Sequence, residues 1–198
     1  MPLRSKFKLD KTVFSIGTHA EHQAAERAYW LSRTPLERLA ATELMRQINY
    51  GYNPLTDRVQ RVLMCLNSAK VEYLLVGGYP VSFYGYARAT ADIDVWIRVN
   101  KENAGRVSRA LIEFGFDPAN VRPELFLRKG KIFRIGLPPL RIDILTRISG
   151  VTFEKCYPER TGARIDGIQV PVIGLNDLKK NKRASGRLKD LDDLENLP

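Results

Sequence analysis

Three aspartates stand on segments that read as strands, and their spacing indicates cation chemistry. Asp92 and Asp94 are separated by one apolar residue, so on a strand both carboxylates point to one side, about 7 Å apart at the Cα level. Asp143 lies between two isoleucines on another apolar segment. If the two strands are neighbours, three carboxylates converge on one patch and repel one another unless a cation neutralises them.

Magnesium is the cation that such a cluster favours. It prefers oxygen ligands and commonly binds through one or two carboxylates together with substrate phosphates. Two such ions, about 4 Å apart, can activate an attacking hydroxyl and stabilise a leaving pyrophosphate. We therefore expect two Mg²⁺ ions, with Mn²⁺ as the alternative, at Asp92, Asp94 and Asp143. A salt-bridged end of a sheet is the other interpretation of the Asp-x-Asp pair.

A pair of glycines, Gly77 and Gly78, follows the apolar run 71–76. Glycine has no Cβ, so a phosphate can approach the backbone N–H groups closely, and a helix that follows presents its positive end. The pair therefore predicts a triphosphate cradle, although a tight turn explains two glycines equally simply.

Alternating and helical patterns predict the elements that hold these residues. Two helices are expected over 19–48, divided at Ser32–Pro35, with Thr34 and Glu37 forming a capping box, and a third helix follows Thr56 or Asp57. Beyond them a mixed α/β core is predicted. Its expected elements are strands at 71–76, 92–99 and 140–146, helices at 81–86 and 102–114, hairpins at 125–135 and 163–173, and a helical segment at 176–197 interrupted at Gly186.

Composition excludes several classes of protein. The chain has 198 residues, 44% hydrophobic and 27% charged, which is typical of a compact domain and not of a disordered or collagen-like chain. Its two cysteines form no C-x-x-C pair, and no apolar stretch approaches the length of a membrane span. We expect a cytoplasmic protein without membrane contact. The net charge of +10 suits a polyanionic partner such as RNA or nucleotide phosphates, and is also compatible with solubility alone.

The order strand, Gly-Gly, helix, Asp-x-Asp, then an aspartate between apolar residues resembles the DNA polymerase β-type nucleotidyltransferase superfamily over about residues 71–146. The wording of residues 88–94 (RATADID) and of 175–194 (LNDLKKNKRASGRLKDLDDL) is similar to bacterial stand-alone members related to the toxins of abortive-infection and toxin–antitoxin systems. The resemblance implies a mixed-sheet nucleotidyltransferase core at 67–174, an N-terminal helical extension at 1–66 and a C-terminal helical segment at 175–198.

Carried over by position, the resemblance implies that Gly77 and Gly78 hold phosphates and that Asp92 and Asp94 hold metals. Asp143 would bind a metal and act as general base toward the acceptor hydroxyl. Many relatives have serine as the second member of the glycine pair, so Gly78 lacks a hydroxyl that could touch phosphate.

Four further residues are candidates for nucleotide binding. Arg88 and Thr90 precede the aspartates and could contact the triphosphate or the acceptor. The alternative is that Arg88 is a solvated residue and Thr90 a turn residue. Lys182 and Arg187 could reach the triphosphate, with Asp190 and Asp193 orienting them; ion pairs within the helical segment are the alternative.

The function expected from these residues is metal-dependent transfer of NMP from an NTP to an acceptor hydroxyl, with RNA such as a tRNA 3′ end as acceptor and a toxin-type or phage-defence role. A small hydroxylated compound such as an antibiotic, or a protein hydroxyl, is the second candidate acceptor. The non-enzymatic alternative is an inactive nucleotide- or RNA-binding module or antitoxin. A protein antitoxin or toxin is the partner that the resemblance implies.

Overall fold

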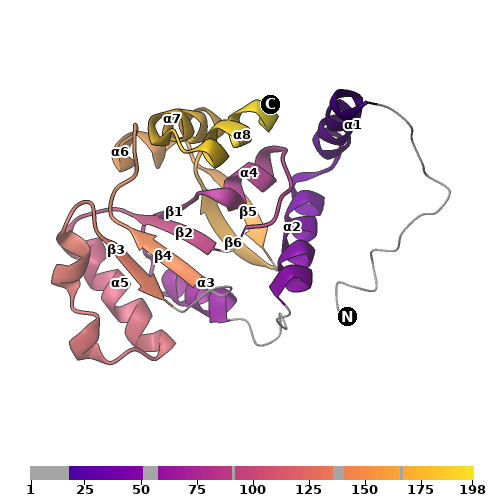
Figure 1. The fold of residues 1–198 in the computed structure, drawn as a ribbon. Coiled ribbons are helices and arrows are strands. Elements are labelled where there is room, and N and C mark those ends of the chain that lie inside the picture. Colours follow the sequence, from indigo (N-terminus) through magenta and orange to yellow (C-terminus); the bar gives the residue numbers. More distant parts are fainter. Residues whose placement is uncertain (1–17, 51–57, 91, 136–140, 166) are drawn as a thin grey trace.

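The computed structural model describes residues 18–50, 58–90, 92–135, 141–165 and 167–198, which form a six-stranded sheet with helices on both faces (Figure 1). The strand order is β3-β4-β2-β1-β6-β5. The strands are β1 (Tyr73–Val76), β2 (Asp92–Ile97), β3 (Ile132–Ile135), β4 (Arg141–Leu145), β5 (Thr161–Ile165) and β6 (Ile168–Val172). Two neighbouring pairs, β2–β4 and β1–β6, are parallel and the others antiparallel, which confirms the predicted mixed α/β fold.

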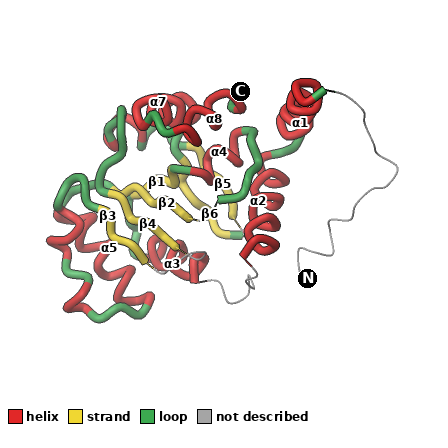
Figure 2. Tube along the Cα trace, viewed as in Figure 1, coloured by secondary structure: helices red, strands yellow, loops and turns green. Residues whose placement is uncertain are grey.

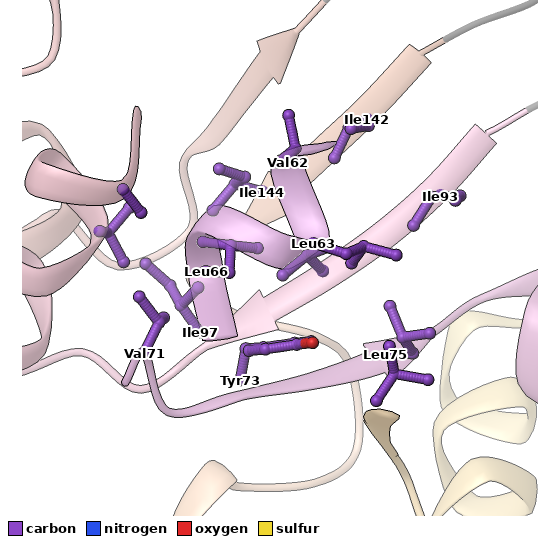
Figure 3. Close-up of a cluster of buried hydrophobic side chains, with 14 of the residues drawn as sticks. Val62, Leu63, Leu66, Val71, Tyr73, Leu75, Ile93, Ile97, Ile142 and Ile144 are labelled. Atoms are coloured by element: carbon purple, nitrogen blue, oxygen red, sulfur yellow. The ribbon is translucent and has the colours of Figure 1, made fainter. Parts of the chain in front are cut away.

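One face of the sheet is covered by α3 (Arg58–Ser68) and α5 (Lys101–Phe114). Alternate strand residues such as Tyr73, Leu75 and Ile93 point to this face and are buried there because side chains alternate along a strand. Figure 3 shows the core that results, in which Val62, Leu63 and Leu66 of α3 lie over isoleucines of β2 and β4. Thus α3, although it begins in the segment expected to be an extension, packs its apolar side on the sheet.

The opposite face carries α4 (Gly78–Tyr84), α6 (Phe153–Cys156), α7 (Leu175–Ser185) and α8 (Leu188–Asn196), as Figures 1 and 2 show. Leu74 and Trp96 point into this layer, where the Trp96 and Phe153 rings meet edge to face at 5.2 Å between centroids. Asp92 and Asp94 share the parity of Trp96 on β2, so the carboxylates belong to this face.

The two N-terminal helices are α1 (His19–Ser32) and α2 (Pro35–Tyr50), divided where the sequence predicted. The expected capping box is present: Glu37 accepts from the Thr34 backbone N–H at 2.7 Å, and Thr34 Oγ1 accepts from the Glu37 N–H at 3.3 Å. The α2 helix docks on α4 through the buried Arg38, which donates to the carbonyls of Ser82 and Phe83. The division of the chain at 66 and 174 stays a prediction.

Two predicted elements differ from the structure. The expected first arm of a hairpin at 125–128 is instead part of a 3₁₀ helix, η4 (Pro123–Leu127), following a shorter one, η3 (Pro118–Asn120). Pro123 has the fixed φ that starts such a helix, and Phe126 turns inward into the core, so β3 pairs only with β4. The short helix expected at 81–86 begins three residues earlier, at Gly78.

The C-terminal segment forms two helices, α7 and α8, separated at Gly186 as expected, where φ is +65°. Several predicted features lie outside the described residues: the N-terminal cap at Thr56 or Asp57, Leu140 at the start of β4, and Asp166 of the second hairpin. None of the helices in the described ranges is long and apolar enough to cross a bilayer.

Candidate active site

The parallel pairing of β2 and β4 brings the three aspartates together. In this register Asp94 lies opposite Asp143, and Asp92 lies opposite Arg141. Neighbouring strands are about 4.8 Å apart and paired residues project to the same face, so Asp94 and Asp143 are side by side. The strand of Asp143 is therefore a neighbour of the strand of Asp92 and Asp94, which the sequence alone had left open.

The glycine pair packs directly against this cluster. Val76 pairs with Asp94 across β1 and β2, so the turn at Gly77 begins beside the Asp94 side chain. Gly77 has φ +74°, and a Cβ there would stand 2.0 Å from Asp94 Oδ2; a Cβ at Gly78 would stand 2.6 Å from Thr90 Oγ1. Both positions therefore need glycine for close packing. Gly77 is partly exposed and Gly78 is buried, so the role in phosphate binding that the sequence suggested for them is a separate proposal.

Asp94 is the carboxylate without a counter-ion. Within the described residues no donor bonds it. Burial, and after it the neighbouring Asp143 and Asp92, raise its pKa to about 6, while Lys182 and Arg187 act in the opposite direction. A divalent cation bound beside these three carboxylates would favour the ionised form of Asp94.

Two arginines that the sequence analysis did not single out neutralise the other two aspartates. Arg134 of β3 holds Asp143 through two parallel hydrogen bonds of 2.9 Å. Arg141 bonds Asp92 Oδ2 and stands 3.5 Å from Asp143 Oδ1. The signal was present for Arg141, which shares the parity of Asp143 on one strand. The Arg134 contact depends on the pairing of β3 with β4. The sequence analysis had instead paired the segment of β3 with residues 125–128.

The donor set fits a divalent cation in part. Asp92 Oδ1 is buried and has no hydrogen-bond partner, and the unpaired Asp94 carboxylate is close by on the same strand face. Two carboxylates are a usual protein contribution to a magnesium site. However, in the described part of the chain no three acidic, histidine or cysteine side chains are arranged to hold one ion. Each oxygen of Asp143 already accepts one hydrogen bond from Arg134, so this guanidinium competes with an ion for Asp143.

A buried ionic network joins the C-terminal helices to the segment before β2. Arg88 grips Asp193 with bonds of 2.6 and 2.8 Å. Lys182 donates to Asp190 at 2.6 Å and to Asp193 at 2.7 Å, and Arg187 donates to Asp190 at 2.7 Å. The Asp193 side chain is fully buried. These contacts are the ion pairs that the sequence offered as one interpretation of the helical segment, and a role of Lys182 and Arg187 in binding a triphosphate stays a prediction.

The network leaves its cations in different states. Lys182 and Arg88 are largely enclosed, whereas the Arg187 side chain is 76% exposed and is bonded by Asp190 through Nε. Burial raises the pKa of Asp190, but hydrogen bonds from Lys182, Arg187 and Ser185 outweigh it and lower that pKa to about 2. Arg187 is therefore the cation best placed to take a further ligand while the network stays intact.

Thr90 lies between the two halves of the site. Its side chain is buried against Gly78, and its hydroxyl is 3.4 Å from the carbonyl of Asp92. This contact supports the start of β2; Ala91, between Thr90 and Asp92, lies outside the described residues. A turn-supporting role explains Thr90 without any ligand.

Comparison with known proteins adds a likeness of shape. No protein-family model and no curated protein sequence matches the chain. Among solved structures it is similar to a protein of Thermotoga maritima described as a "putative nucleotidyltransferase", with a TM-score of 0.46 and 16% identity over 69% of this chain and 88% of that one. At this level of similarity the function of the chain has to be inferred from its own residues.

Proposed function

We propose that the protein is a metal-dependent nucleotidyltransferase that moves NMP from an NTP to an acceptor hydroxyl and releases pyrophosphate. The observation that carries the proposal is the half-buried Asp94, which makes no hydrogen bond or ion pair with the described residues and lies beside Asp92 and Asp143 and next to the Gly77 turn. A purely structural salt-bridged sheet end would pair all three carboxylates. Here one remains without a partner in the described structure, at the point where a cation would lower the free energy most.

Asp92 and Asp94 would hold the divalent ion, and Asp143 would join them once released from Arg134. Bound there, Mg²⁺ or Mn²⁺ supplies charge neutralisation for the triphosphate and lowers the pKa of the attacking hydroxyl. In the reaction the acceptor oxygen forms a bond to the α-phosphorus while the bond between that phosphorus and the β-phosphate bridging oxygen breaks. Asp143 accepts the hydroxyl proton, and pyrophosphate leaves with the electron pair of the broken bond.

Positive charge for the triphosphate comes from the C-terminal helices. Arg187 offers an exposed guanidinium near Asp94, and Lys182 stands behind it, close enough to oppose the rise in the pKa of Asp94. Phosphoryl-type transfer depends mainly on positioning and charge stabilisation, which a fixed pair of cations supplies. The amide groups of the Gly77–Gly78 turn are the second proposed phosphate contact.

RNA is the acceptor that we propose, because the chain carries a net charge of +10 while the acidic cluster is confined to the site. A toxin-type role rests on the resemblance of residues 175–194 alone. Transfer to a small hydroxylated compound uses the same residues and differs only in the acceptor.

The direct test incubates the protein with α-³²P-labelled NTPs, Mg²⁺ and total RNA, and follows labelled RNA and released pyrophosphate. The wild type and Glu124→Gln, which removes an exposed carboxylate far from the cluster, should label RNA equally. Asp94→Asn should reduce labelling by at least about a hundredfold. Undiminished labelling by Asp94→Asn would exclude this site; pyrophosphate release with small acceptors but not with RNA would reassign the acceptor.

A further inference from the structure

A basic groove lies where α3 ends and α5 begins. Figure 1 shows these two helices on the face of the sheet opposite the carboxylates. It has a volume of about 680 Å³, and its cationic lining residues are Lys70, Lys101, Arg106 and Arg109. Glu102 is the one acid among the described residues that line it. The groove is therefore a concentrated positive patch in a part of the molecule that the candidate active site does not use.

Three of the four cations have no acidic partner within the described ranges. Glu102 pairs with Arg106 at 2.5 Å, which leaves the charges of Lys70, Lys101 and Arg109 uncompensated. Arg106 also donates to the carbonyl of Lys70 at 3.1 Å and so ties the end of α3 to the first turns of α5. The walls of the groove are thus held at a fixed spacing, while the free charges project from it.

Lys70 occupies a backbone conformation that does not suit lysine. Its φ is +55°, and it is the non-glycine residue with positive φ among those described. Glycine or asparagine fits such a position better, because the left-handed conformation costs other residues about 1 kcal/mol. The end of α3 accounts for this conformation, because the Lys70 N–H donates to the carbonyl of Asn67 and the Val71 N–H to that of Leu66, both at 2.9 Å, so Lys70 is fixed beside the other cations of the groove.

The chemistry of the groove selects the ligand. No aromatic or methionine side chain lines it, so it lacks the apolar centre of a protein interface. Its volume is many times that of a water molecule and too large for a lone phosphate. Several unpaired cations in an open polar groove are the pattern that contacts successive phosphates of a nucleic-acid backbone without reading its bases.

We propose that this groove binds the phosphate backbone of the acceptor RNA at a distance from its reacting end. The proposal rests on the proposed function in so far as RNA is the acceptor. The groove lies beyond the carboxyl end of β2, whereas Asp92 and Asp94 lie at the start of that strand. The seven steps of chain from Asp94 to Lys101 span roughly 20 Å, so only an RNA longer than a few nucleotides can touch both places.

Equilibrium binding tests the groove without any chemistry. A 5′-fluorescent 30-nucleotide RNA is titrated with full-length protein in EDTA and without NTP, and its anisotropy is followed at several salt concentrations. The groove variant combines Lys70→Asn, Lys101→Gln and Arg109→Gln. Its Kd should rise at least tenfold, and the slope of log K against log salt should become shallower by about 2, because three phosphate contacts of a single strand are lost.

A matched variant controls for net charge. Arg122→Gln, Lys155→Gln and Arg164→Gln also remove three positive charges, each from an exposed side chain outside the groove, and should change Kd less than about threefold. Lys70→Asn alone should keep the melting temperature, because asparagine tolerates positive φ. The proposal would be overturned if both triple variants lost RNA affinity equally, if the Kd of the groove variant were unchanged, or if the wild type did not bind RNA. Binding of polyglutamate in place of RNA, dependent on the groove residues, would overturn it as well.

Acceptor length separates the failure of this proposal from failure of the proposed function. With a long RNA acceptor the groove variant should show a KM raised about tenfold, and with a trinucleotide acceptor its KM should equal that of the wild type. Loss of transfer to the trinucleotide would mean that the variant damages the active site and would contradict the groove. A wild type that transfers to no acceptor would refute the proposed function, while the anisotropy result would still decide whether the groove binds RNA.

Discussion

At the scale of single residues, the buried charge of Asp94 should make the metal-free protein less stable as pH rises. Its pKa is about 6 in the folded chain and near the ordinary value of 3.8 when unfolded, so between these values the folded state holds the extra proton. Stability therefore falls from about pH 4 to about pH 6 and stays lower above it. Asp94→Asn should raise the melting temperature by roughly 2–4 °C at pH 8, with the gain vanishing toward pH 4. Calorimetry at three pH values, with Glu124→Gln as control, checks this.

Arg134 should compete with a divalent ion for Asp143. Because both oxygens of Asp143 are bonded to this guanidinium, a metal that uses Asp143 must first break two hydrogen bonds. Arg134→Gln should therefore tighten Mn²⁺ binding several-fold, measured by the loss of the free-ion signal in electron paramagnetic resonance. Arg122→Gln, which removes an exposed guanidinium elsewhere, should leave the affinity unchanged. Weaker Mn²⁺ binding in Arg134→Gln would show that this arginine supports the metal site.

The common side of Asp92 and Asp94 was predictable from strand parity alone, and the isoleucines on either side of Asp143 mark a strand from which its side chain projects to the face opposite theirs. The partner of each aspartate was not predictable. Arg134 reaches Asp143 only through the pairing of β3 with β4, and the pairing of Arg88 with Asp193 joins residues 105 positions apart. Such long-range ion pairs depend on how the elements dock, and local patterns carry no information about that.

At the scale of elements, the ionic network should hold α7 and α8 on the sheet layer. Asp193→Ala would leave the guanidinium of Arg88 and the ammonium of Lys182 without their shared, fully buried partner. Breaking a buried pair in this way costs about 3–5 kcal/mol. Urea unfolding should show that loss, whereas Arg187→Gln, whose side chain is mostly exposed, should lose less than about 1 kcal/mol. Similar losses for the two variants would mean that the network does not anchor the helices.

Helices with capping signals and strands with apolar runs were predicted closely, as in α1, α2 and α5. Asn100 caps α5 by accepting from the Asn103 N–H at 2.7 Å, and Gly115 ends it with φ +120°. The error at 125–128 has a physical reason: the apolar residues there suit a strand, but Pro123 and the burial of Phe126 beside α5 favour a 3₁₀ turn. Tertiary packing decided between two conformations that the local sequence allowed.

At the scale of the whole molecule, the distribution of charge sets two surfaces of opposite character. The acidic cluster lies among cations on one face of the sheet, and the basic groove lies on the other. Salt screens exposed charges much more than buried ones, so the two parts of the molecule should respond differently to it. The affinity of the groove for RNA should fall steeply with added salt, whereas the buried Lys182–Asp193 contact should be little affected. The net charge of the chain predicted a polyanionic partner, but only the folded structure shows where the positive charges gather.

The parallel register of β2 and β4 also has a consequence for biosynthesis. Asp94 and Asp143 stand opposite each other in the sheet but are 49 positions apart in the chain, with α5 between them. A ribosome-bound chain that has exposed β2 but still holds β4 in the exit tunnel can pair β2 with β1 but lacks the strand that carries Asp143. The carboxylates therefore meet only after much of the polypeptide has emerged, and a truncated translation product that ends before β4 lacks Asp143 and the strand that positions it.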